Sequence, residues 1–238
     1  GVECGGSDSW SGVTANPLVG QAADRVIEQG GAAILSETSE VFGAEALLLE
    51  RVTSAETGEK LIACFQNWND QSARYGFSLD NNPSPGNKAG GLTTIFEKSL
   101  GAVSKGGSTP LTGVYFYGER VDRPGLGFMD TPGNDPASVT GLLAGGANLV
   151  LFTTGRGSVF GGSIVPTLKI ASNTPMYEKL KADMDFNAGA VLDGASLEST
   201  ADELFELVLA TASGRPSRAE SLGPHEQEFV PWTPGGIL

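Results

Sequence analysis

Short hydrophobic runs alternate along the chain with stretches whose apolar residues recur at helical spacing. The runs have the length of buried strands and lie at 32–36, 113–118, 126–129, 148–153 and 163–170. The helical patterns lie at 16–29, 41–51, 55–74, 92–104, 135–144, 173–184 and 199–213. This alternation predicts an α/β fold with an open, mostly parallel sheet flanked by helices, in a Rossmann-like three-layer architecture.

Punctuating residues predict where the elements begin and end. Asn16, followed by proline, is the expected N-cap of the first helix, and Gly30 is its expected end. Pro166 places the last strand at a sheet edge or at a bulge. Residues 1–14 are predicted to be a polar glycine loop, and 215–238 an extended, proline-punctuated tail. No repeat or linker divides residues 1–238, so we expect one domain.

Composition and charge exclude several classes of function. The chain has 238 residues, a net charge of −13 and 34 glycines. The negative charge argues against nucleic-acid binding and against docking on anionic lipid. No apolar run is long enough for a membrane span. Two cysteines make a disulfide framework unlikely and suit the cytoplasm, and the single histidine, His225, excludes a His-based triad or cage.

The segment from Asn81 to Gly91 combines two prolines with three glycines directly before a helical pattern. Free N–H groups at such a helix start form an anion site, to which Asn87 adds an amide and Lys88 a charge. The alternative is an ordinary surface loop with a stiff entry. The apolar face of the following helix is predicted to contain Leu92, Ile95, Phe96, Leu100 and Val103.

Polar residues follow three of the predicted strands. They are Glu37, Asp130 and the group Thr153, Thr154 and Arg156. Ligands of open α/β sheets bind beyond the carboxyl ends of the strands, so we expect these side chains to form one rim. The glycines around Arg156 allow its loop to hold an oxyanion, and this loop should meet the 83–91 loop at one pocket. A dinucleotide-binding interpretation of the same glycines lacks the required spacing.

The N-terminal segment brings Cys4, Ser7 and Asp8 together within five residues. Cys4 is either a metal ligand or nucleophile, or a buried thiol in a glycine turn. Cys64 lies among apolar residues of a helical pattern and is expected to be core. We expect no disulfide between the two, with Cys4 at the rim.

Four segments, read together, resemble one known family. They are GVECGGSDSWSGVTANP, NPSPGNKAGGLTTIFEKSLGA, FMDTPGNDPASVTGLLAGGAN and FTTGRGSVFG. The chain is similar to the C-terminal region of the altronate dehydratase and galactarate dehydratase family, and closer to the altronate branch. The resemblance implies a metal-dependent hydro-lyase using Fe²⁺ or Mn²⁺, which converts altronate to 2-keto-3-deoxygluconate in hexuronate breakdown. It also implies N-terminal domains in the parent chain, which fits the start at Gly1 without a methionine.

The expected chemistry assigns roles to the candidate residues. Removing the proton beside a carboxylate creates an enediolate, which a divalent cation and positive groups stabilise. The catalytic candidates are Lys88, Glu37 and Asp130. The candidates for binding the sugar acid are Ser7, Asn87, Thr153, Thr154 and Arg156. The metal-ligand candidates are Cys4 and Asp8.

Several alternatives stay open at this stage. Galactarate is another candidate substrate, and a related branch eliminates sulfite from sulfolactate. The isolated chain could instead be a non-catalytic module that binds a sugar acid or assembles with the N-terminal domains of the same parent. A nucleotide-binding oxidoreductase domain has only the weak glycine loop in its favour. The sequence leaves a homo-oligomer open.

Overall fold

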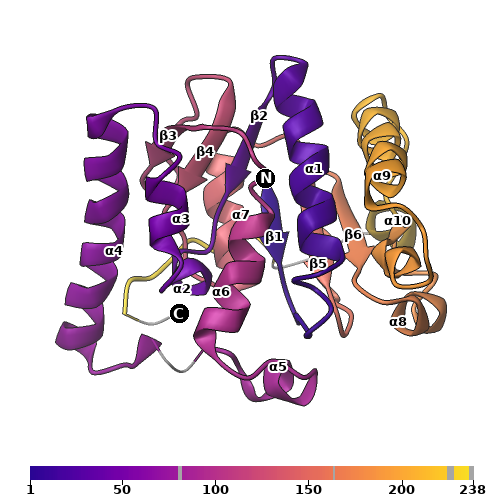
Figure 1. Ribbon diagram of the computed structural model, residues 1–238, viewed down its shortest axis with the longest axis horizontal. Helices are drawn as coiled ribbons and strands as arrows, with labels where there is room; N and C mark the ends of the chain where they lie inside the picture. Colours follow the sequence, from indigo (N-terminus) through magenta and orange to yellow (C-terminus); the bar gives the residue numbers. More distant parts are fainter. Residues whose placement is uncertain (80–81, 163, 224–227, 236–238) are drawn as a thin grey trace.

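Seven parallel strands form the centre of the molecule (Figure 1). The computed structural model describes residues 1–79, 82–162, 164–223 and 228–235. The sheet order is β3-β4-β2-β1-β5-β6-β7, and every pairing among the described strands is parallel, which confirms the predicted α/β fold. The strands are β1 (Val2–Cys4), β2 (Ala32–Leu35), β3 (Leu111–Tyr115), β4 (Gly125–Met129), β5 (Val150–Thr154), β6 (Thr167–Ala171) and β7 (Phe186–Asn187).

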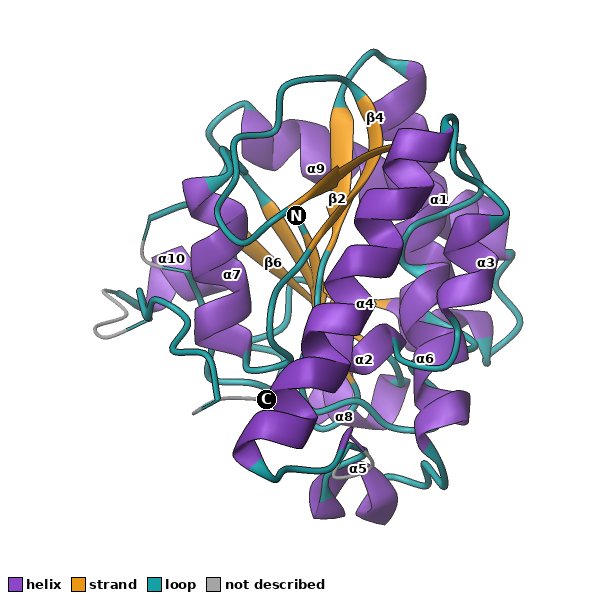
Figure 2. Cartoon of the chain, turned by 90° about the vertical axis from the view of Figure 1, so that its left-hand side faces the viewer, coloured by secondary structure: helices purple, strands orange, loops and turns teal. Residues whose placement is uncertain are grey.

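Helices cover both faces of this sheet (Figure 2). Their bounds are α1 (Ala15–Glu28), α2 (Thr38–Val41), α3 (Glu45–Leu49), α4 (Ala55–Tyr75), α5 (Pro85–Ala89), α6 (Ile95–Ser104), α7 (Asp135–Ala144), α8 (Thr174–Lys179), α9 (Leu197–Ala212) and α10 (Arg218–Leu222), with the 3₁₀ turn η2 (Ala188–Val191). The main core packs α1, α4, α6 and α9 on one face, through residues such as Leu18, Leu61 and Leu204. Helix α7 covers the other face, where Leu142 joins a smaller cluster.

The segment predicted to be an N-terminal loop instead provides the central strand. β1 has only three residues, and it pairs with β2 on one side and β5 on the other. Its middle residue, Glu3, is fully buried. A charged residue in so short a run hides the alternation that normally identifies a strand, so the pattern of residues 1–14 predicted a loop.

The first and last helical boundaries differ from the punctuation-based predictions. α1 begins at Ala15, so Asn16 lies inside the helix and is not its N-cap. Its side chain instead accepts from Thr153 Oγ1 (2.7 Å) and donates to the Gly101 carbonyl (3.1 Å). The predicted tail contains α10, which a capping box of Ser217 and Glu220 starts.

Three further segments also depart from their predicted extents. The predicted helix 41–51 is divided into α2 and α3, and the predicted loop 81–91 contains α5. β6 begins directly after Pro166 and pairs on both sides, so the proline precedes an internal strand and is not at an edge or a bulge. The predicted start of that strand at residue 163 lies outside the described residues.

Helix α6 is rotated relative to the face that its hydrophobicity predicts. Phe96 and Leu100 are 61% and 57% exposed, whereas Lys98 is 9% exposed and Lys105, at its C-terminus, is completely buried. Burying a lysine is costly unless it is paired, so its partners must lie below this helix. The helix therefore exposes two apolar side chains and buries two lysines.

The length and apolar character of the helices decide whether any of them could span a membrane. The longest of those described, α4, has 21 residues, and many of its side chains are polar and exposed. Within the described part of the chain, no helix combines the length and apolar character that a bilayer span requires.

Close packing of α1 against the end of α6 gives a stability prediction. A Cβ on Gly20 would collide with the Ser104 carbonyl and lie 3.0 Å from Gly107 Cα, both backbone atoms. We expect Gly20→Ala to lower the free energy of unfolding by about 1–3 kcal/mol through overpacking. Gly58→Ala is the matched control, since its Cβ would meet Val52 Cγ2 at an ordinary 3.5 Å.

Urea denaturation followed by circular dichroism measures both variants. Gly58→Ala should leave the free energy of unfolding unchanged or raise it by up to about 1 kcal/mol, because alanine favours a helix. Equal effects of the two substitutions would contradict the close contact between α1 and α6.

Candidate active site

The polar residues that follow the strands lie along one edge of the sheet. Glu37 comes after β2, Asp130 after β4, and Thr154 ends β5. Because all these strands run parallel, their carboxyl ends share an edge, and the prediction that the three residues do so is confirmed. After β1 the chain continues to β2 on one side of it, and later returns to add β5 on the other side. β1 therefore lies at the point where the strand order reverses, and open α/β sheets bind their ligands at this point.

A pocket of about 290 Å³ opens at this edge. It lies where the predicted anion loops 83–91 and 153–158 meet, which confirms that they converge. The guanidinium of Arg156 lies directly against Gly86, where a Cβ would have to displace it. The pocket is lined by Cys4, Gly5, Gly6, Ser39, Glu40, Leu79, Asn82, Ser84, Asn87, Lys98, Gly133, Asp135 and Arg156.

A completely buried ion pair lies beneath the pocket. Lys105 Nζ contacts Glu37 Oε2, and neither side chain is exposed to solvent. The same carboxylate oxygen accepts from the Cys4 N–H at 2.9 Å. Burial alone would lower the pKa of Lys105, but the negative groups around it outweigh burial and raise that pKa. The buried pair with Glu37 therefore favours the charged form of Lys105.

Glu37 holds an uncommon backbone conformation. Its φ is 66° and its ψ 65°, in the left-handed region that non-glycine residues rarely adopt. Its N–H donates to Thr131 Oγ1 at 2.7 Å. Such conformations cluster at functional sites, where surrounding contacts hold them in place.

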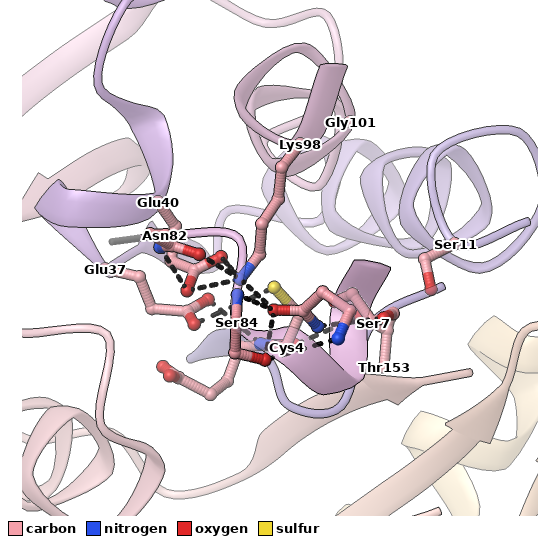
Figure 3. A network of polar contacts seen from close by, with 12 residues as sticks. Cys4, Ser7, Ser11, Glu37, Glu40, Asn82, Ser84, Lys98, Gly101 and Thr153 are labelled. Carbon is pink, nitrogen blue, oxygen red and sulfur yellow. Dashed lines mark hydrogen bonds and ion pairs between the residues drawn. The ribbon is translucent and has the colours of Figure 1, made fainter. Parts of the chain in front are cut away.

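A second, nearly buried lysine reaches into the pocket from α6 (Figure 3). Lys98 Nζ lies 2.6–2.8 Å from the Glu40 carboxylate oxygens, 2.6 Å from Asn82 Oδ1 and 3.1 Å from Asn87 Oδ1. Asn82 also donates to Glu40 at 2.8 Å. Burial, the largest cause, raises the pKa of Glu40. This network fixes the ammonium of Lys98 at the pocket wall.

Two further carboxyl groups at this edge lack a lysine partner. Glu3 Oε2 accepts from Ser36 Oγ at 2.6 Å and from Ser138 Oγ at 2.8 Å, but Glu3 Oε1 is buried with no hydrogen-bond partner among the described residues. Burial and the nearby Glu37 raise the pKa of Glu3. Asp135, at the start of α7, borders the pocket, and burial followed by the charges of Glu37 and Glu40 raises its pKa to about 7.

The catalytic candidates occupy three different environments. Lys88 is exposed on α5 and does not line the pocket. Glu37 is buried in its ion pair. Asp130 Oδ1 accepts from Thr38 Oγ1 at 2.6 Å and from Trp68 Nε1 at 2.7 Å, an arrangement that anchors α4 to the sheet. Their catalytic roles stay predictions.

The binding candidates divide between the pocket and the scaffold. Asn87 and Arg156 line the pocket. Thr153 donates to Asn16, and Thr154 Oγ1 accepts from the Gly157 N–H at 3.1 Å, so both hydroxyls hold the chain. The Ser7 carbonyl accepts from Asn87 Nδ2 at 2.9 Å, which ties the β1 loop to α5.

The metal candidates Cys4 and Asp8 lie in different networks. Asp8 accepts from Ser11, from Ser172 Oγ at 2.8 Å and from Asn173 at 3.0 Å, so its carboxylate joins its own turn to the segment after β6. Cys4 lies at the pocket, as predicted for the rim, and burial followed by Glu37 raises the pKa of its thiol. The thiol is therefore protonated at neutral pH unless a metal displaces the proton.

Both cysteines are free, which confirms the prediction that no disulfide joins them. Cys64 is buried on α4, as expected, and burial raises the pKa of its thiol to about 12. Two groups of side chains in the described chain have the geometry to hold a cation. One contains Cys4, Glu37 and Glu40, and the other Glu3, Glu37 and Asp135.

The sequence interpretation did not identify five charged residues of this edge. They are Glu3, Glu40, Lys98, Lys105 and Asp135. One available signal was position, because Lys98 and Lys105 are seven residues apart and share a helix face with Ile95 and Ala102. A lysine pair on the face of a helix that also carries apolar residues indicates buried acidic partners.

Comparisons with known proteins give consistent matches. Residues 1–237 match the family model described as "D-galactarate/Altronate dehydratase, C-terminal". Altronate dehydratases from Escherichia coli (strain K12) and Bacillus subtilis (strain 168) are 42% and 43% identical over 90% of the chain. Galactarate dehydratase (L-threo-forming) from Escherichia coli is 38% identical over 97% of the chain. The chain spans only 43–44% of the length of these relatives.

The Glu37–Lys105 pair gives the prediction of this section. We expect Lys105→Met to lower the free energy of unfolding by about 3–5 kcal/mol, because Glu37 is left buried without a counter-charge. The double variant Lys105→Met/Glu37→Gln should recover about 2 kcal/mol of that loss.

Urea denaturation of the single and double variants provides the measurement. Lys181→Met is the matched control, because its partner Glu178 is 56% exposed, and it should change the free energy of unfolding by less than about 0.5 kcal/mol. Additive effects of the two buried substitutions would show that the pair is not coupled.

Proposed function

Because the chain belongs to the D-galactarate/altronate dehydratase family, we propose that it is the C-terminal part of a hydro-lyase that removes water from a sugar acid. The proposed reaction is the conversion of D-altronate to 2-keto-3-deoxy-D-gluconate, in hexuronate catabolism. The higher identity to altronate dehydratases than to galactarate dehydratase supports this substrate. The activity is assigned to a longer parent chain, since the relatives extend well beyond the part matched here.

The observation that carries the proposal is that two cationic side chains line the pocket, beside the carboxyl groups of Glu40 and Asp135. Lys98 and Arg156 both line it, in a protein whose net charge is −13. An anionic substrate must overcome that overall field, so it needs a local positive site. A sugar acid also presents several hydroxyls, for which Asn82, Ser84 and Asn87 offer amide and hydroxyl groups around the same space.

The same two cationic side chains suit the negative charge that the proposed reaction develops on the substrate. Removal of the proton on the carbon beside the carboxylate spreads negative charge over the carboxylate oxygens. Arg156 provides a fork that fits a carboxylate bidentately, and Lys98 provides a fixed point charge. Lys98 already contacts the Glu40 carboxylate, so it suits charge stabilisation better than proton abstraction.

A divalent cation fits the residues present. Glu3 Oε1 is buried without a partner, and the two groups of possible ligands offer carboxylate oxygens and one thiol. Such a donor set suits Mn²⁺ and Fe²⁺, the ions expected for this enzyme. When bound, the ion would supply Lewis-acid stabilisation of the developing charge.

The remaining chain of the parent completes the proposal. We propose that its N-terminal domains supply the group that accepts the proton. His225, the only histidine of this chain, lies outside the described residues. The alternatives are galactarate as substrate, elimination of sulfite from sulfolactate, and a module that binds a sugar acid without catalysis when isolated.

Turnover assays of the full-length parent test this function. With altronate and Mn²⁺, we expect Arg156→Ala and Lys98→Met each to lower kcat/KM at least tenfold, because a charged hydrogen-bonding partner contributes about 1.5–3 kcal/mol. Arg215→Ala, which removes an exposed arginine that does not line the pocket, is the matched control and should leave kcat/KM within twofold.

Further arms of the assay separate the alternatives. Faster turnover of galactarate or sulfolactate than of altronate would reassign the substrate, and binding of altronate without turnover by the parent would favour the non-catalytic module. Parental rates in both pocket variants would refute the assignment of the pocket. Lys88→Ala tests the catalytic role predicted for Lys88 from the sequence. A change in kcat/KM of less than twofold would contradict that role.

A further inference from the structure

We propose that Glu3, Glu37 and Asp135 form the binding site of a hard divalent cation directly beside the substrate pocket. The inference deepens the proposed function, and rests on it for the role of the ion in the reaction. The binding itself follows from the geometry of the three carboxylates.

Three separate elements bring these carboxylates together. Glu3 is the middle residue of β1, Glu37 follows β2, and Asp135 begins α7. One oxygen from each lies within 4.8 Å of the other two. Oxygens around one ion with bonds of 2.0–2.6 Å are separated by distances of this order. A strand, the turn after a neighbouring strand and the start of a helix therefore bring three carboxylate oxygens into one cluster.

The carboxylate of Glu3 is the strongest indication that this cluster binds a cation. The residue is 0% exposed, and its Oε2 is already occupied by the hydroxyls of Ser36 and Ser138. This leaves Oε1 available, and that oxygen is buried without a hydrogen-bond partner in the described part of the chain. A buried carboxylate oxygen without any partner costs free energy that a bound cation would recover.

The pattern of ion pairs points to the same place. Glu37 pairs with Lys105 and Glu40 pairs with Lys98, whereas Glu3 and Asp135 make no ion pair among the described residues. The two carboxyl groups without a cationic partner thus adjoin Glu37. A divalent ion there would balance the two unpaired carboxylates.

The competing cluster of Cys4, Glu37 and Glu40 is less suited to a cation. Both of its carboxylates already contact a lysine ammonium, and Asn82 also donates to Glu40. Its third group is a thiol that would have to lose a proton to bind. The proposed cluster offers oxygens only, a donor set that favours Mn²⁺ or Mg²⁺ over Zn²⁺.

The position of Asp135 connects the ion to the substrate. Asp135 lines the pocket together with Arg156 and Lys98, whereas Glu3 does not. A cation on the three carboxylates would therefore have its buried side on Glu3 and its open side toward the pocket. The open side is where the carboxylate and hydroxyls of a sugar acid could reach it.

Mn²⁺ binding, measured by electron paramagnetic resonance without substrate, tests the site on the chain of residues 1–238 and on the full-length parent. We expect one Mn²⁺ per chain, with affinity reduced at least tenfold in Glu3→Gln and in Asp135→Asn. Asp70→Asn makes the same chemical change at an exposed position on α4 and should leave the affinity within twofold. Mg²⁺ should compete with Mn²⁺ for the site. Circular dichroism verifies folding, and Asp135→Asn keeps the test valid if Glu3→Gln fails to fold.

Cys4→Ser and Glu40→Gln provide the discriminating arm. The proposal predicts that both retain Mn²⁺ affinity within about threefold. Loss of binding in these two variants with retention in Asp135→Asn would move the ion to the competing cluster and overturn the proposal. Absence of stoichiometric Mn²⁺ binding by both proteins would overturn it as well.

The outcome is separable from that of the proposed function. Binding that depends on Glu3 and Asp135, in a parent that does not turn over any of the sugar acids, would support the site and refute the dehydratase activity. Turnover of altronate by a parent whose Mn²⁺ affinity is insensitive to both substitutions would do the reverse.

Discussion

The structure depends on keeping charges inside the protein at the carboxyl edge of its sheet. The central constraint is the Glu37–Lys105 pair, from which water is fully excluded. Neither charge can be left without the other, because an unpaired ion in the interior costs several kcal/mol. The end of α6 therefore has to place Lys105 beside the turn that follows β2. At this turn Glu37 adopts a left-handed backbone conformation, with its carboxylate against Lys105. The close contact at Gly20, which seats α1 against this end of α6, serves the same placement.

The polar network extends this constraint to the surface. Lys98 lies two turns before Lys105 and provides a second ammonium group at the pocket. This ammonium donates to the side chains of Asn82 and Asn87. The β1 loop is joined to α5 through Ser7, and to the end of β6 through the hydrogen bond that Ser172 Oγ donates to Asp8. The residues that touch the pocket are thus supported by residues that do not. This is the arrangement expected of a site that must hold its geometry while a ligand binds.

Sequence reasoning recovered the architecture because the apolar runs of β2, β4 and β5 and the helical period of α4, α7 and α9 are local signals. It also placed Glu37, Asp130 and Thr154 on one edge, since parallel strands share their carboxyl ends. It failed where tertiary contacts decide. β1 is recognisable as a strand only through its neighbours. Phe96 and Leu100 appeared to be core because hydrophobicity ranks them above Lys98, yet the acidic residues under α6, distant in sequence, determine which face turns inward. Lys88 is exposed while the adjacent Asn87 lines the pocket, because the sequence motif indicates the segment but not which of its side chains faces the pocket.

The seven-residue spacing of Lys98 and Lys105 has an evolutionary consequence. It corresponds to about 10.5 Å along a helix and nearly two full turns, so both lysines lie on the same side. Inserting or deleting one residue between them would rotate one ammonium by about 100° relative to the other and detach it from its carboxylate. Point substitutions on the exposed side of α6, at Phe96 or Leu100, carry no such penalty. Homologous chains should therefore vary in the outward-facing residues of α6 while conserving its length, because that length sets the distance between the buried ion pair and the pocket.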